Sequence, residues 1–149
     1  MAIARGAGTE ILRSIHLEEV DSSTRRLIVG VQHHIYTVLS VICYAQAVQA
    51  SGNYIRMLIN GYDSLAGSTN RNIYIFCQDM SVEETYVWND KFSFNGFEPT
   101  DFTGPMDDAT KQDAIADQGS SVSQSLMVLS ENAADDFEVT CTFIDQNNA

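Results

Sequence analysis

The sequence has 149 residues, a length typical of one domain, and its 8 basic and 20 acidic residues give a net charge of −12 and a pI near 4.3. This balance argues against DNA, RNA or an anionic membrane as the partner, because those partners attract clustered Lys and Arg. The three cysteines are widely spaced with no C-x-x-C pair, which argues against a disulfide-stapled fold and the common zinc motifs. No apolar run is long enough for a signal peptide or a membrane span, so we expect synthesis and folding in a reducing cytosol.

The charge is unevenly distributed along the chain. Residues 1–56 contain five Arg and four acidic residues, whereas residues 57–149 contain three basic and sixteen acidic residues. The difference is consistent with two distinct contact surfaces, and equally with a simple clustering of acidic loops late in the sequence. Both interpretations stay open at this point.

Short strand-like segments follow one another through the chain. Residues 137–144, FEVTCTFI, alternate between apolar and polar side chains, and residues 54–60 repeat the pattern. Residues 35–45 are apolar on both sides and predict a central strand covered on both faces. Turn residues such as Asn60-Gly61 separate these runs. In chain order, the predicted strands are 11–17, 26–31, 35–45, 54–60, 72–78, 85–88, 91–94, 124–130 and 137–144.

One helix is predicted, over residues 107–117, where an aspartate can cap the first turn and Gly119 can end the last. Its few apolar positions indicate a surface element. Many short strands and one minor helix predict an antiparallel β-sandwich or jelly roll of about eight strands. Within this single fold, residues 1–26 are expected to form an N-terminal arm or edge strand and residues 27–149 the sandwich domain.

The sequence contains no recognised catalytic or metal-binding motif. His33 and His34 are adjacent and point to opposite faces of a strand, so regular geometry does not bring them to one ion. Their ring nitrogens are expected to bind backbone groups at a strand entry. Cys43, Cys77 and Cys141 align with apolar strand residues and are predicted to be small core hydrophobes rather than nucleophiles. We therefore expect no enzyme activity, no catalytic residue, no cofactor and no metal site.

Aromatic residues cluster between positions 86 and 102. Phe92 and Phe94 are predicted to lie in the core. Trp88, Phe97 and Phe102 are candidate contact residues, either for a partner surface or for sugar rings.

Several segments together resemble a known group of proteins. YTVLSVICYAQA at 36–47 is followed by YIRMLINGYD at 54–63, then by a segment over 82–96 containing E-T-x-V-W-x-D-K, and finally by FEVTCTFI at 137–144. With the opening MAIARGAGTEILRS, this order resembles small β-sandwich virion proteins of tailed marine and cyanobacterial phages, such as capsid decoration proteins. The insert 97–122 departs from the shortest members of that group.

The resemblance implies a virion protein without catalytic residues, most simply a decoration (cement) subunit that bridges capsid subunits and stabilises the head. The alternative is a neck, tail or fibre subunit that binds glycans through exposed aromatic residues. The implied partners are the major capsid protein or other virion subunits, and further copies of the chain in a homo-oligomer. The predicted interface residues are Arg5, Arg13, Arg25, Arg26, Trp88, Phe97 and Phe102.

Overall fold

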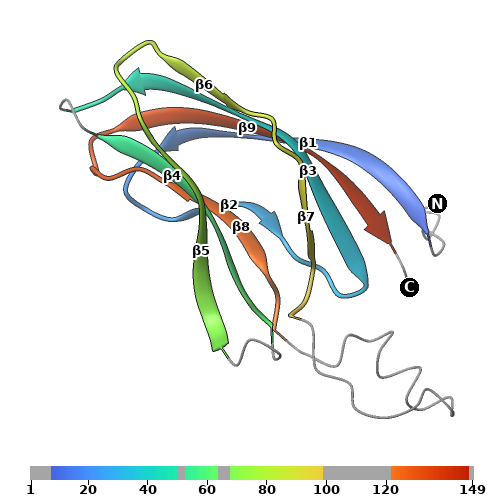
Figure 1. The fold of residues 1–149 in the computed structure, drawn as a ribbon. Coiled ribbons are helices and arrows are strands. Elements are labelled where there is room, and N and C mark those ends of the chain that lie inside the picture. Colours follow the sequence, from blue (N-terminus) through green and yellow to red (C-terminus); the bar gives the residue numbers. More distant parts are fainter. Residues whose placement is uncertain (1–7, 50–52, 64–67, 99–121, 148–149) are drawn as a thin grey trace, which may run out of the picture.

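The computed structural model describes residues 8–49, 53–63, 68–98 and 122–147, which form two antiparallel sheets and no helix (Figure 1). The predicted all-β sandwich is confirmed, and the predicted helix 107–117 lies outside the described residues. The strands are β1 (Thr9–Val20), β2 (Arg25–Val29), β3 (His34–Ala47), β4 (Tyr54–Asp63), β5 (Ser68–Asp79), β6 (Thr85–Trp88), β7 (Phe92–Asn95), β8 (Ser125–Leu129) and β9 (Asp136–Asn147).

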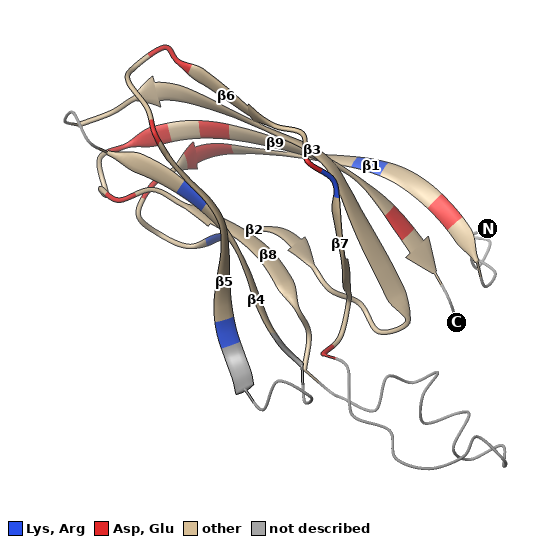
Figure 2. Cartoon of the chain, viewed as in Figure 1, with Lys and Arg blue, Asp and Glu red and all other residues tan. Residues whose placement is uncertain are grey.

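Sheet A has the strand order β1-β9-β3-β6, and β7 also pairs with β3. β6 and β7 share one side of β3: β6 pairs with residues 41–44 and β7 with residues 35–38. One edge of this sheet is therefore β1, and the other is formed by β6 and β7. β3 contains no Lys, Arg, Asp or Glu, and it is tan along its whole length in Figure 2.

Sheet B has the order β2-β8-β4-β5, so its edges are β2 and β5. The two sheets face each other, with β1 of sheet A beside β2 of sheet B. At the opposite side of the sandwich, rings from β5 and β6 are in contact. The sandwich thus has two lateral sides, and each is bounded by one edge from each sheet.

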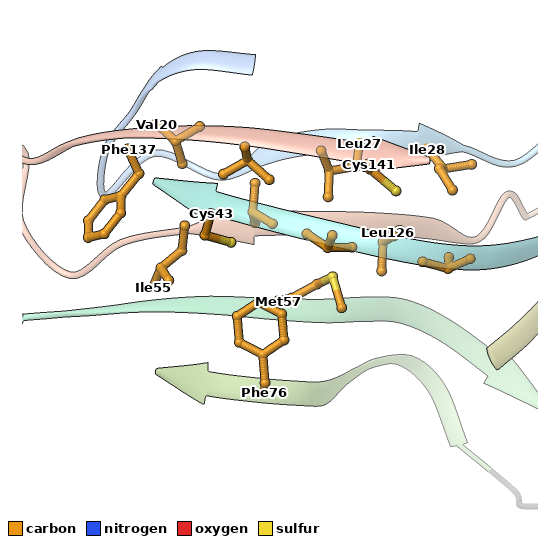
Figure 3. Close-up of a cluster of buried hydrophobic side chains, with 14 of the residues drawn as sticks. Val20, Leu27, Ile28, Cys43, Ile55, Met57, Phe76, Leu126, Phe137 and Cys141 are labelled. Carbon is orange, nitrogen blue, oxygen red and sulfur yellow. The ribbon is translucent and has the colours of Figure 1, made fainter. Parts of the chain in front are cut away.

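The core lies between the sheets and is built from alternate residues of each strand (Figure 3). On β9, Phe137, Val139 and Cys141 are fully buried, and on β4 the same is true of Ile55 and Met57. Burial of one large apolar side chain stabilises a fold by about 1.5–3 kcal/mol. The predicted core faces of 54–60 and 137–144 are confirmed.

Cys77 departs from its prediction as a core residue. β5 has an extra residue, Ile75, where its register with β4 shifts after Met57. A one-residue bulge turns the side chains beyond it to the other face of a sheet. Phe76 therefore points into the core, whereas Cys77 lies opposite Arg56 and is exposed.

β3 also departs from its prediction. It is central in sheet A, and the face that carries Tyr36, Val38 and Cys43 is buried. The opposite face is not covered by the described residues, and the Ile42 side chain there is 40% exposed. A sandwich of two sheets buries only the inner face of each sheet, so the outer side chains of a central strand stay at the surface.

The connection after β2 crosses the end of β7 at close range. Gly30 N–H donates to the Gln124 carbonyl at 2.8 Å, and Gln124 N–H donates to the Gly96 carbonyl at 2.8 Å. A Cβ atom on Gly30 would lie 1.9 Å from the Gly96 carbonyl oxygen. Only glycine fits there, and the crossing ties both sheets together at this end.

Candidate interaction surfaces

β1 is an edge strand with an exposed side. It pairs with β9 from Thr9 to Leu17 in continuous register, and its other side has no strand partner among the described residues. Proteins usually protect such edges with charges, prolines or bulges, because unpaired backbone groups bind other strands. Here Ile11 is 42% exposed and Leu12 67% exposed. Charged residues of β1 and a bulge near its end protect part of this edge, and the pair Ile11–Leu12 is its least protected stretch.

The far end of β1 carries the one bulge of this edge. The register with β9 shifts between Leu17 and Val20, and Glu19 has a positive φ of 54°. Arg25 Nη1 donates to the carbonyls of Glu18 and Glu19 at 3.3 and 3.4 Å. Arg25, predicted as a contact residue, therefore stabilises the bulge from within the chain.

Arg13, another predicted contact residue, binds a buried carboxylate. Its Nη1 donates to Asp145 Oδ2 at 3.1 Å, and His34 Nδ1 donates to Asp145 Oδ1 at 2.6 Å. The Asp145 side chain is 1% exposed, so it would be costly to bury without these partners. His34 was expected to bind backbone groups, and it binds this side chain instead. The cluster links β1, β3 and β9 at one end of sheet A.

Between β1 and β2 the sandwich is incompletely filled. A cavity of about 230 Å³ opens there to the surface. Its volume equals that of roughly eight water molecules in the liquid, so the two edges do not pack closely against each other along this stretch. We call this cavity the open seam. It is lined by Arg13, Ser14, Ile15, Leu27, Ile28, Val29, Val31, Tyr36 and Phe143.

Of the two remaining predicted arginines, one lies on this side of the sandwich. Arg26 is exposed on β2, opposite Met127 of β8. Arg5 lies outside the described residues.

The opposite side of the sandwich is filled by aromatic rings, and we call it the closed seam. Phe76 of β5 contacts Tyr86 edge-on at a centroid distance of 5.1 Å and Trp88 at 5.7 Å. Trp88, predicted as a contact residue, is half-buried and packs on the core. Phe97 is half-buried and forms a bridge with Ser123, and Phe102 lies outside the described residues.

The outer face of sheet A has an uncharged area, which is recognised only when neighbouring strands are considered together. Three adjacent rows across its strands contain no Lys, Arg, Asp or Glu. We call this surface the neutral face. Its residues are Leu12, Ser14 and His16 of β1, Thr140, Thr142 and Ile144 of β9, Thr37, Ser40 and Ile42 of β3, and Val87 and Ser93 of β6 and β7.

Polar groups of the neutral face bind one another across the strands. Ser14 and Thr142 hydroxyls are 3.2 Å apart, and those of Thr37 and Ser93 are 2.9 Å apart. His16 Nδ1 lies 2.7 Å from Thr140 Oγ1. Sequence reasoning missed this surface, although the alternate threonines of 137–144 and the uncharged run 35–45 were visible. What was missing is which strands are neighbours.

The thiols of Cys43 and Cys141 are buried and weakly acidic. Burial raises the pKa of Cys43 to about 12, with a smaller contribution from the neighbouring Cys141 thiol. Burial likewise raises the pKa of Cys141 to about 12. Neither thiol forms the reactive thiolate near neutral pH.

Two further features are absent from residues 8–49, 53–63, 68–98 and 122–147. No group of three or more His, Cys, Asp or Glu side chains is arranged to hold a metal ion. No helix there has the length and apolarity that crossing a membrane requires.

Comparisons with known proteins add little to this geometry. No protein-family model matches the sequence, and no curated protein is similar to it at a significant level. One solved structure is similar in fold: a chain from the disulfide-linked pili of Bacillus endospore appendages, with a TM-score of 0.47 and 10% identity. The similarity covers 100% of this chain and 97% of that one. At this level it concerns the all-β architecture alone, and the resemblance to phage virion proteins stays a prediction.

Proposed function

We propose that the chain is a non-catalytic structural subunit of a larger protein assembly, attached to neighbouring subunits through its β1–β2 side. The open seam carries this proposal. β1 presents one unpaired side, and Val29 and Val31 are 53% and 51% exposed at the rim of the cavity. A strand from a neighbouring subunit would pair with β1 and place apolar side chains in the cavity.

The finer assignment is a decoration subunit of a phage capsid. It is supported by the sequence resemblance over 36–63, 82–96 and 137–144. In this role the subunit bridges capsid subunits and adds contacts that resist the internal pressure of packaged DNA. Its acidic surface would face outwards, because an acidic lining would repel DNA. A neck or tail position is the alternative that the same resemblance allows.

Glycan binding through Trp88 has less support. The ring is half-buried and packs against Phe76. A sugar-binding platform needs an exposed aromatic face.

The test is reconstitution of particles that lack the chain. Purified protein is added to particles from a deletion mutant of the encoding virus, and bound copies are counted by gel densitometry. Val29→Lys places a charge at the rim of the open seam, and we expect a loss of at least roughly tenfold in occupancy. The matched control is Val82→Lys, since Val82 is 55% exposed and lies away from the seam.

Equal occupancy of the two variants would contradict the role of the open seam. Absence of the wild-type chain from purified particles would contradict the virion assignment.

A further inference from the structure

We propose that the neutral face binds the neutral face of a second copy, so that the chain forms a two-fold symmetric dimer. This inference deepens the proposed function, since it names one partner of the assembly and the surface that holds it. It involves sheet A's outer face rather than the open seam.

The first argument is the composition of β3. This strand contains no Lys, Arg, Asp or Glu, and its residues on the neutral face are Thr37, Ser40 and Ile42. Among the described residues only the inner face of β3 is covered, and Ile42 and its neighbour Val87 are 40% and 51% exposed. Leu12, at the other end of the neutral face, is 67% exposed. A solvated outer face usually carries charged and polar side chains, whereas these positions are apolar.

The second argument is the state of the polar groups. The Ser14–Thr142, Thr37–Ser93 and His16–Thr140 contacts satisfy hydroxyl groups within the sheet. A hydroxyl that already has a partner can be removed from water at little cost, whereas an unpaired one cannot. The neutral face can therefore be removed from water in a protein contact without leaving these hydroxyl groups unpaired.

The third argument is charge, and it identifies the partner. A copy of this chain carries a net charge of −12, so most approaches of two copies are repulsive. The neutral face lessens this repulsion, because its three rows contain no acidic residue, and the acids of the same face, Glu10, Glu18 and Glu138, lie beyond these rows. Asp90 and Lys91, in the connection between β6 and β7 at one border of the face, offset each other in charge. A basic partner would instead require acidic residues on the face. Self-association fits the face better than binding to a basic protein.

The outer face of sheet B makes a useful contrast. Arg26 and Arg56 lie on strands of that sheet, and the Arg56 guanidinium is 4.4 Å from the centre of the Tyr54 ring. Tyr54 in turn donates to Glu131 at 2.8 Å. A dry contact there would bury charges, which is costly.

The dimensions suit a weak dimer. Strand spacing of about 4.8 Å and a rise of about 3.3 Å per residue make the three neutral rows, from Thr140 to Ile144 on β9, roughly 19 by 17 Å. This is less than half of the roughly 800 Å² per partner of a standard interface, so the contact belongs to the weak class and needs high protein concentration. Two twisted sheets can stack with strands inclined by about 30°, and a two-fold axis makes the contact self-complementary.

The experiment places one charge at the centre of the face. Thr142 lies in the middle row on β9, so two copies of it approach each other near the two-fold axis. Sedimentation equilibrium from about 1 μM to 1 mM measures the dimer. We expect Thr142→Glu and Thr142→Lys each to weaken dimerisation by roughly a hundredfold, because each places like charges together. An equimolar mixture of the two variants restores the dimer, since opposite charges then meet.

The control pair is Val82→Glu and Val82→Lys, which change charge equally at an exposed site outside the neutral face. We expect both to dimerise like wild type. Far-UV circular dichroism and thermal unfolding confirm that the Thr142 variants fold. A wild-type monomer over the whole range, unaltered dimerisation of Thr142→Glu, or a mixture that stays monomeric would each overturn the proposal.

The outcomes separate this inference from the proposed function. Wild-type protein that is monomeric yet occupies particles overturns the dimer and keeps the structural role. A dimer that is lost in Thr142→Glu but never occupies particles keeps the neutral-face contact and removes the virion role.

Discussion

The two lateral sides of the sandwich differ in how the space between the two sheets is filled. At the closed seam, the rings of Phe76, Tyr86 and Trp88 fill the space between β5 and β6. At the open seam, β1 and β2 leave a cavity of about 230 Å³, and an ion-paired cluster around Asp145 holds the strand ends. Both sides border the same core, yet only the closed seam is filled by side chains of the chain itself.

The contrast indicates a division of roles. Aromatic packing excludes water and fixes two edges without a partner. An open side sacrifices some of that stabilisation and keeps a site where another chain can add its own side chains. The closed seam therefore maintains the fold, and the open seam is the side from which attachment is proposed.

The largest predicted effect is at the closed seam. Phe76→Ala removes a side chain that is 8% exposed and contacts two rings, so we expect the free energy of unfolding to fall by about 3–5 kcal/mol. Ile15→Ala at the open seam should cost only about 1–2 kcal/mol, because Ile15 is half-buried beside a cavity. Urea unfolding followed by circular dichroism measures both. Equal losses would show that the two seams do not differ as described.

A smaller loss of stability is expected when the ion-paired cluster around Asp145 is disrupted. Asp145→Asn keeps the shape of the side chain but removes the charge that Arg13 and His34 bind, so stability at pH 7 should fall by about 1–3 kcal/mol. Asp90→Asn is the control, since Asp90 is exposed near β6 and its replacement should change stability by less than about 0.5 kcal/mol. An Asp145→Asn variant as stable as its control would mean that the cluster does not hold this side together.

The thiols between the seams predict an alkaline effect. Their pKa values are raised from 9.0 to about 12 in the folded chain, so folding favours the neutral thiol. Their contribution is therefore complete below about pH 9 and is lost as the pH rises towards 12, at about 1 kcal/mol per pH unit for each thiol. Unfolding free energies between pH 9 and 11 should fall less steeply in the Cys43→Ala/Cys141→Ala double variant than in wild type. The same slope in both would contradict the burial of the thiols.

The smallest effect is a difference in rate. Cys141 lies opposite Ile15 of the open seam, and Cys43 lies opposite Tyr86 of the closed seam. Local opening should expose the less packed side more often, so Cys141 should be alkylated several-fold faster than Cys43 in the native chain. Mass spectrometry of peptides after timed labelling measures the two rates, with the exposed Cys77 as an internal standard. Faster labelling of Cys43 would reverse the comparison.

Local sequence patterns were sufficient for the strands. All nine predicted segments coincide with strands of the structure, because alternation of apolar and polar residues is a local property. β1 and β9 extend beyond their predicted bounds through polar residues that pair at the sheet edge. Cys77 was misplaced, since one bulged residue in β5 is enough to exchange the two faces of a strand.

The surfaces could not be predicted in the same way. The contact between His34 and Asp145 joins residues 111 positions apart, and the neutral face combines strands from both ends of the chain. Such neighbours depend on strand order, which composition and spacing do not determine. The arginine positions were visible, but Arg13 and Arg25 have partners inside the chain, which only the structure reveals.

The position of β9 has a consequence for how the molecule is made. β9 lies between β1 and β3, and it is translated after every other described strand. Until it leaves the ribosome, β1 has no partner in sheet A and the β3 pairing is half complete. The contacts that join these strands span most of the chain, a topology associated with slow folding. Nascent chains should therefore expose β1 and β3 together, which leaves them open to premature association until β9 is complete.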